Sequence, residues 1–349
     1  MSRLLTTVSA ITVIASTYVN ADVPKVVADI APIHSLVSRV MNGIGEPKLI
    51  VPNETSPHDY RLRPADAQAI EEANLVFWMG EGLTPWMERA LEALNSDTDV
   101  VEFLALEDSV RLAFREGALF EAHDDHDDHD KDHDEHDDHA GHDDHDDHDD
   151  HDKDHDEHDD HAGHDDHDEH DDHAGHDHGE FDPHAWLSTS NAKTWLNVIA
   201  AKLSSVDPNN AGSYFANASQ ARNELDALDA EINAMLGPVR GGKFIVFHDA
   251  YQYFEAVYDI PASGAISLGD ASDPSAARIA EIANRVKTEN IDCVLSEPQF
   301  NARLVKTVMG ATDAKTQVID PIGLGIEPGY SLYPKLIRAM AQSLVDCLK

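Results

Sequence analysis

Four histidines lie outside a His-rich stretch of the chain, and three of them share one kind of position. His58 follows the apolar run 48–51, and His248 follows the apolar run 243–247. His184 lies in the segment Asp-Pro-His-Ala-Trp-Leu-Ser, just after the His-rich stretch. Open α/β sheets bind ligands beyond the carboxyl ends of their strands, so we expect these three side chains to converge. One histidine in such a position is more often structural, but three of four favour a shared site.

Three neutral imidazoles predict a Zn²⁺ site, because zinc takes nitrogen and sulfur ligands in a tetrahedral arrangement. Mn²⁺ and Mg²⁺ prefer more carboxylate oxygen. The fourth ligand is water or a carboxylate that follows a predicted strand, either Asp320 or Glu297. Each carboxylate could instead cap a helix or hydrogen-bond to a ligand. His34 lies on a predicted helix, and we interpret it as structural or merely nearby.

The elements that position these residues alternate between short apolar runs and segments with helical periodicity. In the first half, strands are predicted at 26–30, 48–51, 75–79 and 100–103, with helices at 33–42, from Pro64, and at 85–94. In the second half, strands are predicted at 243–247, 262–266, 291–295 and 317–319, with helices at 249–257, 274–289, 303–309 and 330–348. This rhythm predicts an α/β fold of two lobes, each a mostly parallel sheet flanked by helices.

The domain organisation follows from these series. Residues 1–21 are predicted to be a signal peptide, 22–207 an N-terminal lobe, 208–236 a long linking helix and 237–349 a C-terminal lobe. The linking helix would be roughly 43 Å long at about 1.5 Å per residue. The metal cleft is expected between the two lobes.

The chain begins with the features of a secretory signal. Arg3 precedes an apolar run at 4–19, and Val19-Asn20-Ala21 places small residues around a cleavage site. No cysteine follows that run, so we expect an exported protein without a membrane anchor. The chain has two cysteines, Cys293 and Cys347, and such a pair in an exported protein predicts one disulfide; two unpaired buried thiols are the alternative.

Residues 121–180 form an insert of unusual composition. Of the chain's 23 histidines, 19 lie between residues 123 and 178, together with 29 acidic residues and two lysines. Residues 123–141 recur identically at 145–163. The tract has almost no apolar side chains, so we expect disorder without ligand and interpret it as a flexible, lower-affinity zinc collector. The alternative is an acidic spacer. The formal net charge of −42 argues against a nucleic-acid binder.

Several motifs resemble the ZnuA-type zinc-binding proteins of bacterial high-affinity zinc ABC importers, among the metal-binding solute receptors. The matching motifs are Ser-Pro-His-Asp-Tyr at 56–60, Pro-His-Ala-Trp-Leu-Ser at 183–188, Phe-His-Asp-Ala-Tyr at 247–251, Glu-Pro-Gln-Phe at 297–300 and Asp-Pro-Ile-Gly at 320–323. The resemblance implies that His58, His184 and His248 bind zinc, that Cys293 pairs with Cys347, and that Asp320 occupies the carboxylate-ligand position of manganese-type relatives. A Glu that precedes the first histidine in some zinc members is replaced here by Pro57.

These observations lead to a functional hypothesis with open alternatives. The leading one is a periplasmic, monomeric zinc receptor that delivers Zn²⁺ to an ABC permease in the inner membrane and is not an enzyme. A second is a secreted zinc hydrolase, although no His-Glu-x-x-His motif or nucleophile elbow is present. A third is a zinc buffer or chaperone that depends mainly on the insert. A receptor for another divalent metal, manganese or nickel, is a further alternative.

Overall fold

The computed structural model describes residues 23–92, 98–115, 120, 181–267, 274–299, 305, 307, 310 and 314–349. The predicted signal peptide, the insert 121–180 and most of the predicted helix 303–309 lie outside these residues. None of the helices in the described ranges combines the length and the apolarity needed to cross a membrane.

The described strands form two four-stranded parallel sheets. The first has the order β2-β1-β3-β4 and consists of β1 (Val26–Ala28), β2 (Lys48–Leu49), β3 (Leu75–Trp78) and β4 (Asp99–Glu102). The second has the order β6-β5-β7-β8 and consists of β5 (Phe244–His248), β6 (Gly264–Ser267), β7 (Cys293–Ser296) and β8 (Lys315–Val318). The predicted fold class is therefore confirmed, with strand boundaries that differ from the predicted ones by at most two residues.

Helices cover the sheets because the central strands are apolar on both faces. Strands β1, β3 and β5 are buried at every position, which is typical of parallel strands packed between helices. The helices of the first half are α1 (Ala31–Val40), α2 (Pro64–Glu71) and α3 (Pro85–Glu92), and those of the second are α6 (Gln252–Tyr258) and α7 (Ala276–Thr288). Helix α2 starts at Pro64 as predicted, because proline suits the first helical position.

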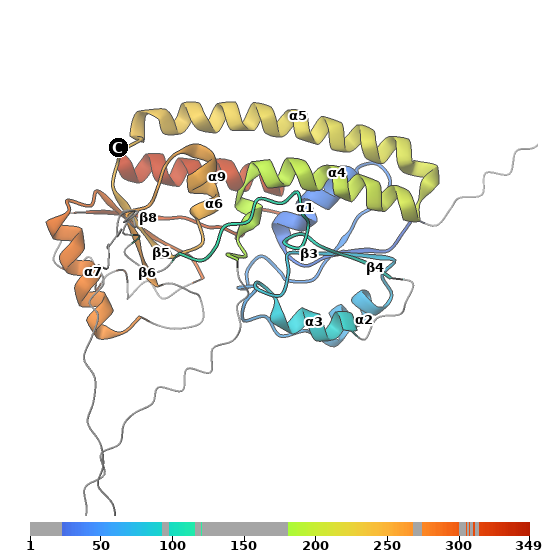
Figure 1. Cartoon of the computed structure of the whole chain (residues 1–349), viewed down its shortest axis with the longest axis horizontal. Helices are drawn as coiled ribbons and strands as arrows, with labels where there is room; N and C mark the ends of the chain where they lie inside the picture. The colour runs from blue at the N-terminus through green and yellow to red at the C-terminus, as the bar shows by residue number, and fades with distance from the viewer. Residues whose placement is uncertain are drawn as a thin grey trace, which may run out of the picture. The chain divides into compact units, whose positions relative to one another are not determined.

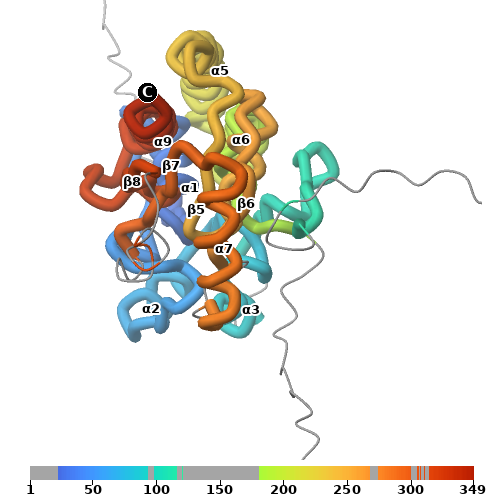
Figure 2. Tube along the Cα trace, turned by 90° about the vertical axis from the view of Figure 1, so that its left-hand side faces the viewer, coloured from blue at the N-terminus to red at the C-terminus, as the bar shows by residue number. Residues whose placement is uncertain are grey.

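Long helices connect the halves. Helix α4 (Thr189–Val206) begins where the Ser188 side chain accepts a hydrogen bond from the backbone N–H of Asn191. A short 3₁₀ turn at Pro208–Asn210 separates it from α5 (Ala211–Leu236), which runs above both sheets in Figure 1. Helix α5 packs against α4, α1 and the C-terminal α9 (Leu332–Leu348). The side view in Figure 2 shows α5 and α9 on the same side of the sheets.

One large apolar core extends through both halves, from Val26 to Cys347 in sequence, and a smaller cluster lies between the second sheet and α7. The Cys293–Cys347 disulfide joins β7 to α9, with 5.7 Å between the two Cα atoms, so the predicted disulfide is confirmed. Contacts group the described residues before and after the insert into one unit, and the lobe boundaries at 207–208 and 236–237 stay predictions.

Candidate metal centre

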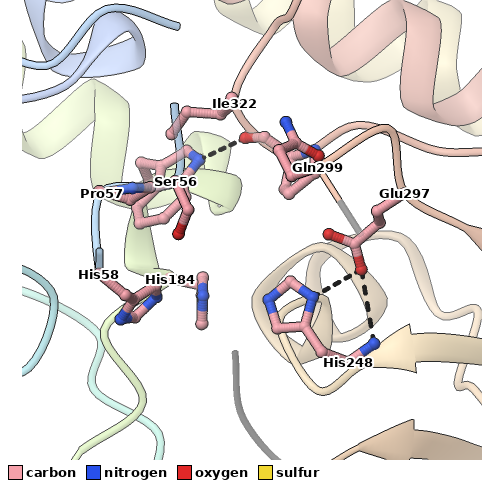
Figure 3. Close-up of a pocket in the computed structure, with 10 residues that line it drawn as sticks. Ser56, Pro57, His58, His184, His248, Glu297, Gln299 and Ile322 are labelled. Atoms are coloured by element: carbon pink, nitrogen blue, oxygen red, sulfur yellow. Dashed lines mark hydrogen bonds and ion pairs between the residues drawn. The ribbon is translucent and has the colours of Figure 1, made fainter. Parts of the chain in front are cut away.

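His58, His184 and His248 line one small cavity (Figure 3). Its volume is about 20 Å³, which is enough for a water molecule or an ion but far below the roughly 300 Å³ or more of sites for organic ligands. The structure thus brings together the three histidines that the sequence predicted. The other lining residues are Ser56, Pro57, Trp186, Glu297, Gln299, Pro321 and Ile322.

Each histidine comes from a different part of the fold. His58 lies in the loop between β2 and α2, where Trp86 Nε1 donates a hydrogen bond to the carbonyl oxygen of Pro57 at 3.1 Å. His184 immediately precedes the 3₁₀ turn Ala185–Leu187 that leads into α4. His248 is the last residue of β5, in register with Ser267 of β6. As predicted, His248 lies at the carboxyl end of a central parallel strand, where open sheets place ligands.

The imidazole rings are spaced for a common ligand. The ring centroids of His58 and His184 are 5.6 Å apart, and those of His184 and His248 are 5.3 Å apart. Zn–N bonds of roughly 2.0–2.1 Å at tetrahedral angles place the centroids of two coordinating imidazoles about 5 Å apart. Among the described residues, no three His, Cys, Asp or Glu side chains are already gathered at coordinating distance.

Two carboxylates orient two of these rings. Asp182 Oδ1 lies 2.7 Å from His184 Nδ1, and Glu297 Oε1 lies 2.6 Å from His248 Nδ1 (Figure 3 shows the second pair). An ionised carboxylate only accepts hydrogen bonds, so Nδ1 of each ring is the donor. This tautomer places the ring lone pair on Nε2. Carboxylates in this position fix ring orientation and increase the basicity of the metal-binding nitrogen.

The two candidate fourth ligands are placed differently. Glu297 lines the cavity, with its Oε1 on His248, and its side chain is almost fully buried. Asp320 is not among the residues that line the cavity. Its Oδ1 accepts hydrogen bonds from the backbone N–H groups of Ile322 and Gly323, at 3.0 and 3.1 Å, and from Gln299 Nε2 at 3.2 Å. Coordination by this oxygen would require these bonds to break.

Sequence reasoning missed two charged residues near the cavity. Asp182 lies two residues before His184, and the spacing Asp-Pro-His was the signal that could have revealed it. Arg115 forms ion pairs with Asp249 and Glu255, which lie beyond the insert in sequence. Burial raises the pKa of Asp249, while hydrogen bonds and charge from Arg115 act to lower it.

His34 lies apart from the three cavity histidines. It is on α1 and lines a different cavity, of about 190 Å³, with residues that include Glu46 and Tyr330. Its Nε2 lies 3.0 Å from the carbonyl oxygen of Pro47. Burial lowers the pKa of this imidazole, although the Pro47 hydrogen bond and the charge of Glu46 oppose the effect. These contacts agree with a structural role.

Comparisons with known proteins show which family the chain belongs to. Residues 26–347 match the family model ZnuA, described as zinc-uptake complex component A, periplasmic. The high-affinity zinc uptake system protein ZnuA of Brucella abortus is 45% identical over 323 residues, which cover 93% of this chain and 91% of that relative. A crystal structure of ZnuA matches with a TM-score of 0.68 at 20% identity and covers 94% of this chain and 100% of that one. The solute-binding protein FpvC of Pseudomonas aeruginosa, in complex with Mn²⁺, also matches at 0.68 with 20% identity, covering 94% of this chain and 99% of that one.

Two parallel sheets flanked by helices, with long helices between them, are the fold that this chain shares with these solved structures. The chain belongs to the ZnuA family of zinc-uptake proteins.

Proposed function

We propose that this protein is a periplasmic receptor that captures Zn²⁺ between its two lobes and delivers it to an ABC importer for high-affinity uptake. The observation that carries the proposal is the small cavity lined by His58, His184 and His248, in which buried carboxylates lie at hydrogen-bond distance from Nδ1 of His184 and of His248. The zinc-uptake relatives support the same conclusion.

The donor set supports zinc as the cargo. Three imidazoles suit Zn²⁺ better than Mn²⁺, which prefers carboxylate oxygen. The fourth donor is water, Asp320 or Glu297. The hydrogen bonds described for the two carboxylates involve Glu297 Oε1 and Asp320 Oδ1, so a carboxylate ligand would bind zinc through its second oxygen. Cu²⁺ and Ni²⁺ are expected to compete in vitro according to the Irving–Williams order.

A receptor fits the cavity better than a hydrolase does. A catalytic zinc site has to admit an organic substrate beside the metal. A volume of about 20 Å³ admits the ion and little else. The partner in this proposal is the permease of an ABC importer in the inner membrane, and the signal peptide at 1–21 would export the chain as a monomer to the periplasm.

Zinc titration against a competing chelator tests the proposal. The chain and a variant that lacks residues 123–178 are expected to share one tight site. His58→Ala, His184→Ala and His248→Ala should each weaken that site by orders of magnitude, because each removes one of three Zn–N bonds. His34→Ala is the matched control and should bind as the wild type does. Zinc affinity equal to that of the wild type in all three cavity variants would contradict the proposal.

The insert supports one alternative, a zinc buffer or chaperone. Its 19 histidines among acidic residues could bind several zinc ions. A receptor keeps its tight site when residues 123–178 are removed, whereas a buffer loses nearly all of its zinc. Equal zinc stoichiometry of the two proteins at pH 7 would leave the insert without a collecting role.

A further inference from the structure

The two chain segments that flank the insert pair with each other. Ala113 forms an antiparallel bridge with Phe181, and the backbone N–H of Asp182 donates to the carbonyl oxygen of Leu112 at 2.9 Å. We call residues 110–115 and 181–184 the stem. The stem follows the first sheet in sequence, and its second segment ends at His184.

The stem is bonded to helix α6, which follows β5 of the second sheet. Tyr253 receives a hydrogen bond from the backbone N–H of Leu112 and donates one to the carbonyl oxygen of Asp182, both at 2.9 Å. Gln252 Nε2 donates to Asp182 Oδ2 at 2.6 Å and to the carbonyl oxygen of Ala113 at 3.1 Å. The Asp182 carboxylate therefore holds His184 with one oxygen and α6 with the other.

Arg115, at the end of the first stem segment, binds two buried carboxylates. Its Nε lies 2.9 Å from Asp249 Oδ2, its Nη2 also contacts Asp249, and its Nη1 lies 2.8 Å from Glu255 Oε2. The Asp249 and Glu255 side chains are 5% and 6% exposed, so each would be costly to bury without a cation. The guanidinium lies over the Phe120 ring, 3.6 Å from its centroid. A planar fork reaches both carboxylates at once, which an ammonium group cannot do as well.

We propose that Arg115 is a positioning residue for the metal site. Asp249 directly follows His248, so its ion pair with Arg115 fixes the end of β5. The same stem carries His184 and its carboxylate. Arg115, in the stem that flanks the insert, thereby sets the separation of the His184 and His248 rings, whose centroids are 5.3 Å apart. This inference rests on the proposed zinc site and adds a residue that determines its geometry.

The test is a zinc titration of the full chain against a competing chelator, followed by tryptophan fluorescence because Trp186 lines the cavity. Arg115→Gln should weaken zinc binding about tenfold, at the low end of the 10–100-fold seen for outer partners of metal ligands. Removal of a positive charge by itself would strengthen cation binding, so the sign separates positioning from through-space electrostatics. Tighter or unchanged binding overturns the proposal.

Arg111→Gln is the matched control. It removes the same charge from the same stem, but the Arg111 guanidinium lies over the Phe181 ring, 5.0 Å from its centroid. It should leave zinc affinity within about twofold of wild type, since isolated surface substitutions have small effects. A loss equal to that of Arg115→Gln would overturn the assignment to Arg115.

A double-mutant cycle separates positioning from general destabilisation. If Arg115 acts through Asp249, Arg115→Gln combined with Asp249→Asn should lose no more affinity than Asp249→Asn alone. Two losses that add would contradict the inference. Arg115→Lys, which keeps the charge but not the fork, should show an intermediate loss, and it provides the test if Arg115→Gln does not fold. If both the Arg115 variants and His248→Ala bind zinc as tightly as the wild type, the proposed zinc site itself fails. If the Arg115 variants bind like the wild type but His248→Ala does not, only this inference fails.

Discussion

Trp186 donates its indole N–H to the carbonyl oxygen of Pro321, at 2.8 Å, and both residues line the metal cavity. Trp186 belongs to the turn that leads into α4, whereas Pro321 follows β8 of the second sheet. The bond is buried, since Trp186 is 1% exposed. One wall of the cavity is therefore closed by a direct bond between the two halves of the chain.

Trp186→Phe should lower the free energy of unfolding by about 1–3 kcal/mol, because it removes the indole N–H and leaves the carbonyl oxygen of Pro321 without this hydrogen bond. Urea denaturation of the metal-free protein measures the change. Phe215→Leu, at a half-exposed position of α5, is the control and should stay within about 0.5 kcal/mol of wild type. Equal stability of the Trp186 variant and the wild type would contradict this account.

Asp182→Asn and Glu297→Gln should each weaken zinc binding about 10–100-fold, because an amide no longer enforces the Nδ1–H tautomer of its histidine. Chelator competition measures the affinities. Asp207→Asn is a suitable control: Asp207 is also buried, but it accepts its hydrogen bonds from Asn210 and Tyr214 instead of a histidine. Zinc affinity that is as high in the two variants as in the control would show that the carboxylates do not tune the site.

Stability should fall as pH rises from 5 to 8 because of Asp29. Burial raises the pKa of this carboxyl to about 7, against the opposing hydrogen bonds from the backbone N–H groups of Met79 and Ile30. At pH values between the ordinary pKa of an aspartate and 7, Asp29 is protonated in the native state but ionised in the unfolded chain. Rising pH therefore favours unfolding, and the free energy of unfolding falls by up to about 4 kcal/mol in total.

The comparison uses Asp29→Asn, which lacks this titration. Urea denaturation at several pH values should show the stability of wild type relative to Asp29→Asn declining from pH 5 to 8. Asp66→Asn is the control. Burial acts to raise the pKa of Asp66, but hydrogen bonds from Arg63 and Tyr60 lower it overall, so its own titration lies below this range. A pH-independent difference for Asp29→Asn would refute the prediction.

Reduction of Cys293–Cys347 should destabilise the protein by about 4 kcal/mol, the chain-entropy value for a loop of this size. The two cysteines are 54 residues apart in sequence. Thermal melting with and without reductant measures the change, and the double variant Cys293→Ser, Cys347→Ser should not respond to reductant. A melting temperature of the wild type that is insensitive to reductant would argue against a stabilising role.

The order and type of the elements could be predicted because most are encoded locally. The buried strand β3 is an uninterrupted apolar run, and β5 is apolar at every position except its last residue, His248. Strand β8 was predicted two residues late, since three of its four residues, Lys315 to Gln317, are polar and the strand lies at a sheet edge. The lateral order of the strands was not predicted, because parallel pairing joins residues that are far apart in sequence.

The three cavity histidines were predictable because each follows a recognisable local pattern. The ion pairs of Arg115 with Asp249 and Glu255 were not, since they span 134 and 140 residues and leave no periodic signal. The orientation of Asp320 was also beyond prediction. Whether a carboxylate faces a cavity or caps the backbone that follows it depends on the turn that it enters, here at Ile322 and Gly323.

The continuous core, which extends through both halves from Val26 to Cys347, has a kinetic consequence. Swinging the halves apart would expose this core to water, at about 25 cal/mol for each Å² of apolar surface. We therefore expect zinc to enter and leave by small movements of the loops around the cavity. The lifetime of the loaded receptor would then depend on ligand exchange at the metal, one nitrogen after another, and the cargo would be released only where something else offers it replacement donors.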